Sequence, residues 1–155
     1  MQKAFRLLAL RSRSEKELRA GLRKKGFEEH VVDAVIGRLH EMDYLNDASF
    51  ARGWVRTLAI NRLYGNRLIE TSLGEKGIPG SVAKQMLAEI REEFPEAKAI
   101  RKLIEKKIGH RQIAYLDERQ KRSLWQSLAG KGFAPGLIFE AFKQFEEGFT
   151  GNDGE

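Results

Sequence analysis

A ten-residue phrase occurs three times in this chain of 155 residues, and it limits the possible folds more than any other feature. The phrase reads LRAGLRKKGF at residues 18–27, IETSLGEKGI at 69–78 and LWQSLAGKGF at 124–133. Each copy places apolar residues eight and four positions before a glycine, a lysine directly before it and an apolar residue directly after it. Self-similarity at a long, regular spacing is typical of repeat proteins.

The glycine of each phrase, Gly26, Gly77 or Gly132, is expected to end a helix. A helix that must stop and turn back is commonly closed by a residue at positive φ, where glycine has no Cβ to clash. The apolar residue that follows then packs on the last helical turn. The preceding lysine lies at the negative end of the helix dipole, which is a stabilising position, and a role in binding a partner is the alternative interpretation.

Each phrase therefore joins two helices, and a further helix precedes each pair. Apolar residues continue at helical spacing after every glycine. The preceding helices are predicted at residues 3–11, at 48–60 with Asp47 as N-cap, and at 96–109 after Pro95. Ser14 and Glu17 form a predicted capping box before residue 18. The chain is thus expected to be all-α, with nine helices in three groups of three.

The predicted repeats cover residues 1–43, 44–95 and 96–148, and residues 149–155 are expected to be a disordered tail with little apolar surface. Residues 111–116 alternate between polar and apolar side chains, but this stretch is too short to predict a strand. Each group of three helices is small for an independent core, so neighbouring groups should stack. We expect an elongated, curved array.

Composition excludes several classes of protein. The chain has no cysteine, so it has no disulfide framework, thiolate metal site or cysteine nucleophile. Its three histidines, His30, His40 and His110, are too far apart in sequence to suggest a metal site. No secretory signal and no apolar run long enough to span a bilayer is present, so a cytoplasmic protein without a membrane partner is expected. A monomer is also expected. The net charge of +6 favours polyanionic partners.

Charge is distributed unevenly among the predicted helices. The first helix of each repeat is basic: residues 3–13 hold four Lys or Arg and no acid, 48–62 hold three and none, and 96–111 hold six against two acids. Third helices are acidic: residues 28–43 hold one base against five acids, 81–94 two against three, and 135–148 one against three. If corresponding helices align, the array carries one basic and one acidic stripe.

A three-helix unit with a tight turn before its last helix also suggests a helix-turn-helix domain, whose last helix reads the major groove. Such a helix should not repel phosphates, yet here it is acidic in all three repeats. Duplex sequence readout is therefore disfavoured. Phosphate binding by the basic first helices remains open as a contributing activity.

No catalytic motif is found, so an enzyme is not expected and no cofactor is implied. GEKG, residues 74–77, matches the GxxG of a KH loop, but it overlaps a predicted helix end. FARGWVR, residues 50–56, interleaves aromatics with arginines and could stack on bases. The helical spacing of Phe50, Trp54 and Leu58 favours a core role for these residues, and Trp125 is interpreted in the same way.

Three ordered segments resemble the RecX family, the bacterial modulators of the RecA recombinase. These segments are LLALRSRSEKELRAGLRKKGF at residues 7–27, YLNDASFARGWVR at 44–56 and GNRLIETSLGEKGI at 65–78, and residues 123–145 match more loosely. The resemblance implies tandem three-helix repeats. It also implies a protein that is not an enzyme, binds along the groove of the RecA filament on single-stranded DNA, and restrains the filament's ATPase, strand exchange and co-protease activities.

The family's recurrent residues fall on these positions of the chain: Arg11, Ser14, Glu17, Leu18, Tyr44, Leu45, Asp47, Phe50, Ala51, Arg52, Gly65, Lys76 and Gly77. Several already have structural explanations as caps, core residues or turns. The chain departs from the family pattern at two positions. Asp43 replaces a glycine, which puts the turn there in question, and Asn46 replaces an aspartate.

On this basis the predicted partners are the RecA filament and single-stranded DNA. The residues predicted to contact a partner or DNA are Arg6, Arg11, Arg13, Arg52, Arg56, Lys76, Lys102 and Lys106. A nucleic-acid-binding module without a recombinase target is the alternative, and a purely structural adaptor is a third hypothesis.

Overall fold

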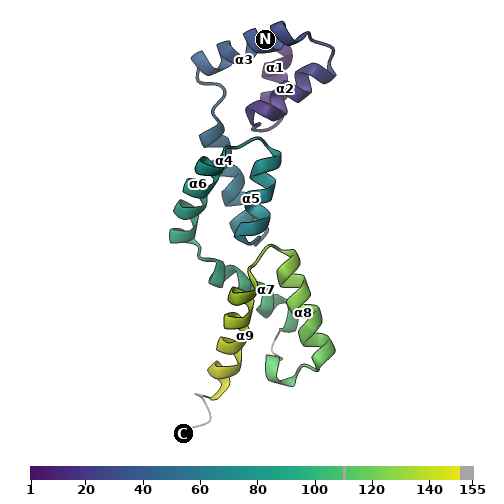
Figure 1. Cartoon of the computed structure of the whole chain (residues 1–155), viewed down its shortest axis with the longest axis vertical. Coiled ribbons are helices and arrows are strands. Elements are labelled where there is room, and N and C mark those ends of the chain that lie inside the picture. Colours follow the sequence, from purple (N-terminus) through teal and green to yellow (C-terminus); the bar gives the residue numbers. More distant parts are fainter. Residues whose placement is uncertain (110, 151–155) are drawn as a thin grey trace. The chain divides into compact units, whose positions relative to one another are not determined.

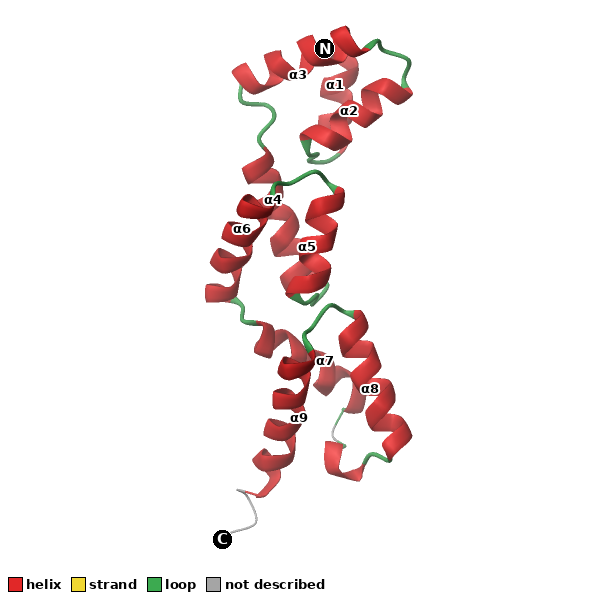
Figure 2. Cartoon of the chain, viewed as in Figure 1, coloured by secondary structure: helices red, strands yellow, loops and turns green. Residues whose placement is uncertain are grey.

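The computed structural model describes residues 1–109 and 111–150, and all regular structure in that part of the chain is helical (Figure 1, Figure 2). Its nine α-helices are α1 Gln2–Leu10, α2 Glu15–Lys24, α3 Glu29–Glu41, α4 Asp47–Arg56, α5 Asn66–Glu75, α6 Gly80–Glu93, α7 Glu96–Ile108, α8 Glu118–Gly130 and α9 Pro135–Thr150. A π-helical turn, Thr57–Asn61, continues α4, and a 3-10 turn, Ile113–Tyr115, precedes α8. The predicted all-α fold with nine helices is confirmed for the described residues.

The chain divides into two compact units, and the division runs through the middle group of helices. Unit 1 comprises Met1–Val55 and Glu70–Met86, and unit 2 comprises Arg56–Ile69 and the chain from Leu87 onward. Within unit 1, one core cluster consists of Ala4, Leu18, Leu22, Val32, Ile36, Leu39 and Leu45. Within unit 2, a core cluster consists of Phe94, Ala99, Ile100, Ile104, Ile108, Ile113, Leu116, Leu124, Leu128, Phe133 and Ile138. The repeat boundaries given above stay predictions. Of the predicted tail, residues 149 and 150 belong to α9, which runs from Pro135 to Thr150, and residues 151–155 lie outside the described residues.

The three phrase glycines end their helices as predicted. Their φ angles are +92° at Gly26, +77° at Gly77 and +95° at Gly132. After each glycine, the next backbone N–H donates to the carbonyl five residues earlier: Phe27 to Leu22 at 3.4 Å, Ile78 to Leu73 at 3.0 Å, and Phe133 to Leu128 at 3.4 Å. We call these turns the first, second and third corners. Each one satisfies carbonyls that a helix end otherwise leaves unpaired.

The start of α4 differs from the prediction. Asn46, not Asp47, caps this helix, because its side-chain oxygen accepts from the Ser49 backbone N–H at 3.1 Å. Asp47 is the first residue of α4, and its Oδ1 accepts from the backbone N–H of Glu15 at 2.9 Å. The predicted N-cap role of Asp47 is therefore wrong, since this carboxylate binds the first turn of α2 instead.

The turn that precedes this cap forms without glycine. Asp43 takes φ +58°, in the left-handed region that aspartate tolerates better than most residues. The N–H groups of Asp43 and Tyr44 donate to His40 and Leu39 at 3.1 and 2.9 Å. The doubt raised by the missing glycine is thereby resolved, because the helix end is closed in the usual way.

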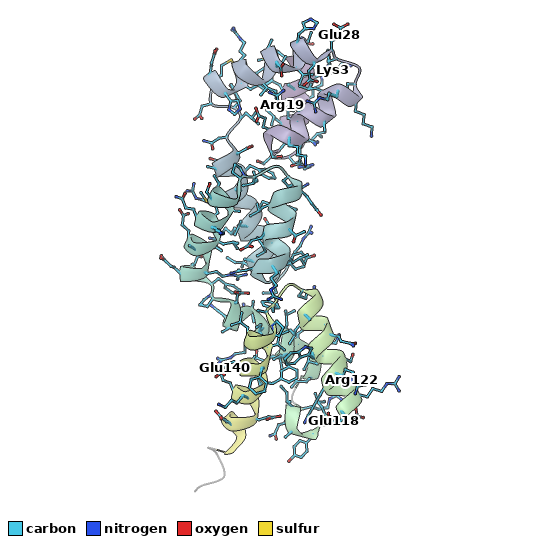
Figure 3. All side chains as sticks on the ribbon, in the orientation of Figure 1. Lys3, Arg19, Glu28, Glu118, Arg122 and Glu140 are labelled. Atoms are coloured by element: carbon cyan, nitrogen blue, oxygen red, sulfur yellow. The ribbon has the colours of Figure 1, made fainter. Side chains whose placement is uncertain are left out.

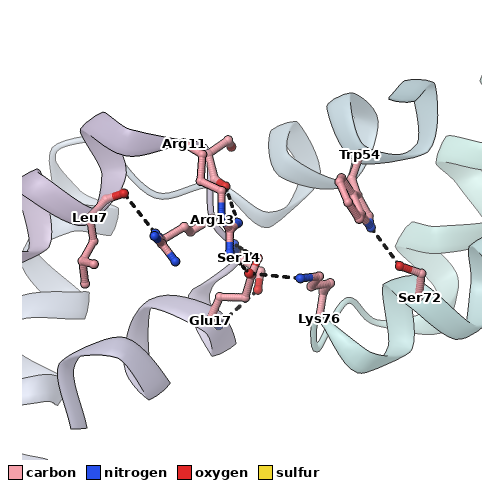
Figure 4. Close-up of polar contacts among 9 residues, drawn as sticks. Leu7, Arg11, Arg13, Ser14, Glu17, Trp54, Ser72 and Lys76 are labelled. Carbon is pink, nitrogen blue, oxygen red and sulfur yellow. Dashed lines mark hydrogen bonds and ion pairs between the residues drawn. The ribbon is translucent and has the colours of Figure 1, made fainter. Parts of the chain in front are cut away.

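In unit 1, the second corner packs on the start of α2. A Cβ added to Gly77 would lie 2.9 Å from Cβ of Lys16, which is closer than real Cβ atoms approach. Beside it, the Lys76 ammonium donates to Oε2 of Glu17 at 3.1 Å, and Arg11 also pairs with that carboxylate (Figure 4). Glu17 further completes the predicted capping box with Ser14, which is confirmed. We call Glu17, Arg11, Ser14 and Lys76 the Glu17 cluster.

In unit 2, the third corner packs on the start of α5 by the same rule. A Cβ added to Gly132 would lie 2.5 Å from the backbone nitrogen of Leu68. Two backbone hydrogen bonds join the segments: Gly65 donates to the Lys131 carbonyl at 2.7 Å, and Arg67 to the Gly132 carbonyl at 3.2 Å. The second corner thus packs against the first turn of α2, and the third corner packs against the first turn of α5. In both cases this helix is the second one of the preceding group of three.

Alanine substitution at two of the corners should separate the stability cost of the backbone conformation from the stability cost of lost packing space. Gly26 has positive φ but nothing within 4 Å of an added Cβ, so Gly26→Ala should cost only the left-handed strain, about 1 to 2 kcal/mol. Gly132→Ala adds a backbone clash and should cost at least about 2 kcal/mol more. Urea unfolding monitored by circular dichroism measures both, and equal losses would show that the third corner is not tightly packed.

The Glu17 cluster should make stability depend on acid pH. Burial opposes ionisation of Glu17, but hydrogen bonds from Arg11, Lys76 and the Ser14 backbone outweigh it and lower the pKa to about 2. A lowered pKa stabilises the fold above the unfolded-state value of 4.5, and this stabilisation is lost as pH falls from there towards 2. Glu17→Gln should therefore be less stable than the native chain at pH 7, by about 1 to 3 kcal/mol.

The difference between the two chains should shrink between pH 5 and pH 2, when the free energy of unfolding is measured by urea titration at each pH. Glu118→Gln is the matched control, because Glu118 is exposed and forms no ion pair with the described residues. A constant difference across that range would contradict the role assigned to the Glu17 carboxylate.

Candidate functional site

The eight basic residues predicted to contact a partner have different surroundings. Arg6, Lys102 and Lys106 are exposed and form no hydrogen bond or ion pair with the described residues. Arg52 and Arg56 are exposed on α4. The other three, Arg11, Arg13 and Lys76, contribute to contacts inside unit 1. The predicted set is thus divided between residues that are exposed to solvent and residues that lie in contacts within unit 1.

The three engaged residues surround the start of α2. Arg13 donates from Nε to the Leu7 carbonyl at 3.0 Å, which ties the end of α1 to the following loop. Arg11 and Lys76 both bind Glu17, whose side chain is only 13% exposed (Figure 4). The Lys76 ammonium also lies 5.5 Å from the centre of the Trp54 ring. These contacts support a structural role for all three residues, and partner contact by them stays a prediction.

Arg56 forms a two-pronged ion pair on the surface of unit 2. Its two terminal nitrogens each lie 2.8 Å from a carboxylate oxygen of Glu93. The hydrogen bond from Arg56 lowers the pKa of Glu93, and the same contact raises that of Arg56. Both side chains are 56% exposed, and exposed pairs are weak and screened by salt, so the pair does not prevent Arg56 from binding another anion.

Acidic residues of α3 are partly neutralised by arginines that the sequence count assigned to another helix. Arg19 of α2 lies 2.6 Å from Asp33, and Arg23 lies 2.6 Å from Glu29. The net charge of residues 28–43 therefore overstates how negative this surface is. The alignment of basic and acidic stripes across repeats stays a prediction.

The exposed face of α7 carries a row of three lysines. Lys98, Lys102 and Lys106 recur every four residues and form no ion pair with the described residues. The ammonium groups of Lys98 and Lys102 lie 5.1 and 5.3 Å from the centre of the Phe94 ring, whose electron-rich face attracts cations. Lys98 was missed in the sequence, although its spacing from Lys102 places both on one helical face.

The aromatic residues of FARGWVR lie in the packing of unit 1. Phe50 is buried and stacks on Trp54, with ring centres 6.4 Å apart. Trp54 donates from its indole nitrogen to Ser72 Oγ at 2.9 Å (Figure 4). In unit 2, Trp125 meets Phe142 edge-on at 5.7 Å and packs on the core cluster. The core interpretation is supported over base stacking.

Arg91 is a structural residue that sequence reasoning missed. Inside unit 2 it donates to the Tyr64 carbonyl and to Asn66 Oδ1, both at 2.8 Å, and to the Phe94 carbonyl at 3.2 Å. Burial lowers the pKa of its guanidinium, and Glu96 opposes that shift. Tyr64 and Asn66 are 27 and 25 residues away from Arg91, so no local pattern identifies these two bonds.

Other kinds of site find no support in the described part of the chain. Residues 1–109 and 111–150 contain no group of three or more His, Cys, Asp or Glu side chains placed to hold a metal ion. His110 lies outside the described residues. Among those residues, no helix has the length and hydrophobicity that crossing a bilayer requires. The exposed basic side chains are the remaining candidate for recognition.

Comparison with family models matches the three groups of helices one by one. Residues 1–39 match the first three-helix domain of RecX, 46–87 the second and 95–142 the third. The regulatory protein RecX of Amycolatopsis mediterranei (strain U-32) is 35% identical over 141 residues, which cover 90% of this chain and 79% of that protein. The regulatory protein RecX of Syntrophotalea carbinolica is 31% identical over 142 residues, covering 91% and 92% of the two chains.

A solved structure has the same fold. The crystal structure of RecX from Lactobacillus salivarius superposes with a TM-score of 0.79 at 24% sequence identity, and the match covers 94% of both chains. All three domain models and relatives above 30% identity thus agree over most of the chain. The chain therefore belongs to the RecX family of regulatory proteins.

Proposed function

We propose that this protein binds the RecA filament on single-stranded DNA and restrains its ATPase, strand exchange and co-protease activities. The supporting observation is that similarity to regulatory RecX proteins extends through all three domains and most of the relatives' length. Such a regulator acts in DNA repair, recombination and the SOS response of the cell, and it needs no catalytic site.

The exposed basic side chains support a binding mode with many weak contacts. Arg6 on α1, Arg52 and Arg56 on α4, and Lys102 and Lys106 on α7 are all exposed. Acidic loops of the recombinase or DNA phosphates would attract them, while exposed acids of the third helices would meet basic groups of the filament. Several modest contacts along one chain give high overall affinity through avidity.

The lysine row of α7 favours a second candidate function, which is direct binding of nucleic acid without a recombinase target. Three cations at successive helical turns, with no ion pair among the described residues, fit the regular negative charge of a phosphate backbone. In that case binding to bare single-stranded DNA would weaken steeply as salt is raised, and a recombinase would be unaffected.

The proposed function predicts inhibition of a recombinase. When the full chain is titrated into RecA from the same bacterium with single-stranded DNA and ATP, the rate of ATP hydrolysis should fall to a plateau. Measuring phosphate release checks this, with the chain unfolded by heat as the control. An unchanged rate, together with salt-dependent binding to bare DNA, would favour the second candidate.

Charge reversal should identify which basic residues contribute. The double variant Arg52→Glu and Arg56→Glu should raise the concentration needed for half-inhibition by about tenfold, which corresponds to about 1.4 kcal/mol of binding free energy. Lys84→Glu on α6 is the control for a charge reversal elsewhere on the surface, since Lys84 is exposed and forms no ion pair with the described residues. Circular dichroism should show the same helicity in each variant. Unchanged inhibition by the double variant would remove these arginines from the interface.

A further inference from the structure

Unit 2 contains a pocket of about 410 Å³ between α7 and α9. Residues from one face of each helix line it: Ala97, Arg101 and Glu105 recur every four positions on α7, and Glu140 and Ala141 lie on α9. Figure 3 shows Glu140 on α9. A pocket of this volume is within the range of sites that bind small molecules or single large side chains.

Two small residues explain why the pocket exists. Ala97 and Ala141 stand on opposite walls, where longer side chains would fill the space between the helices. Leu137 and Phe145 of α9 supply further apolar surface, and Leu137 is 36% exposed although it is a large apolar residue. Apolar surface that stays open to solvent in this way is a typical feature of binding sites.

The charges at the pocket have no partners within the described chain. Arg101, Glu105 and Glu140 are exposed, and none of their side chains forms an ion pair or hydrogen bond with the described residues. Arg101 and Glu105 are four residues apart on one helix, a spacing that often gives an ion pair, yet they do not form one. The pocket therefore presents two free carboxylates, one on each wall, and one free guanidinium.

Gln112 adds an unsatisfied hydrogen-bond acceptor to the wall. Its side-chain oxygen is buried and accepts no hydrogen bond from any described residue. A buried polar atom without a partner is costly, and native proteins contain few of them. A donor in the pocket would reach this oxygen only after the Gln112 side chain turns toward it.

We propose that this pocket binds a protein segment that presents one large apolar side chain beside a lysine or arginine. The apolar side chain fills the space between Ala97 and Ala141, and the cation lies between Glu105 and Glu140. Two carboxylates against the one guanidinium of Arg101 leave the pocket with a negative balance, which favours a cationic protein segment over nucleic acid. The inference rests on the proposed function only in assigning this segment to the recombinase.

Filling the pocket tests the proposal without removing any charge. Ala141→Leu should keep the thermal stability of the full chain, because Ala141 is partly buried beside the core cluster and also borders the open space of the pocket. It should also raise the concentration for half-inhibition of the RecA ATPase at least tenfold. Ala129→Leu on α8 is the matched control, since Ala129 is exposed and lies outside the pocket. Should Ala141→Leu fail to fold, Ala97→Leu at an exposed position replaces it.

A direct titration separates this proposal from the proposed function. The probe is a synthetic helical peptide with one phenylalanine and a lysine four residues later, added to the ¹⁵N-labelled full chain. We expect the peptide to shift the amide signals of Ala97, Gln112 and Ala141. These shifts should be lost in Ala141→Leu. They should be reduced when the peptide lysine is replaced by glutamate.

If Ala141→Leu is folded and inhibits the ATPase as well as the native chain does, the proposal of a binding pocket is wrong. The proposed function would be unaffected by that result. If the native chain does not inhibit the ATPase, the proposed function fails and the titration alone decides. Absence of shifts, or equal shifts with both peptides, would then overturn the pocket as well.

Discussion

The close contact between a helix corner and the first turn of an earlier helix is the constraint on which the rest of the structure depends. In unit 2 the backbone of Gly132 lies against Leu68 and Gly65, and in unit 1 Gly77 lies against Lys16. Glycine is required there for two separate reasons, because the chain needs positive φ and because no side chain fits. The repeated phrase therefore ends a helix and also provides the glycine that contacts an earlier helix closely.

The same docking decides which charges are left for partners. Lys76 precedes a docked glycine, so its ammonium reaches Glu17 and stabilises unit 1. Lys131 holds the equivalent position, and its carbonyl accepts the N–H of Gly65 while its ammonium lies 5.2 Å from the Tyr64 ring. Among residues 1–109 and 111–150, the lysines of α7 form no ion pair as close as the one between Lys76 and Glu17. Some lysines thus stabilise the fold and others are exposed for binding a partner, depending on their position in the repeat.

Local patterns predicted much of the fold and less of the site. The corners and the Ser14 capping box follow from interactions within five residues, so the sequence alone identified them. Asp47 binds Glu15 from 32 residues away, and Lys76 binds Glu17 from 59 residues away, so their roles depend on packing that no local pattern contains. The α7 and α9 pocket depends on two alanines that are 44 positions apart in the sequence, at 97 and 141. Such vacant space is visible only once both helices are placed.

The first corner carries a consequence for how the chain assembles. Gly26 has almost the same φ as Gly132, +92° against +95°, although nothing lies within 4 Å of the place its side chain would occupy. The bend is thus intrinsic to the phrase and is not imposed by a neighbour. Early segments can bend correctly while later ones are still being synthesised, because the hydrogen bonds that close them span only a few residues. The geometry of this corner therefore does not require the later repeats to be present.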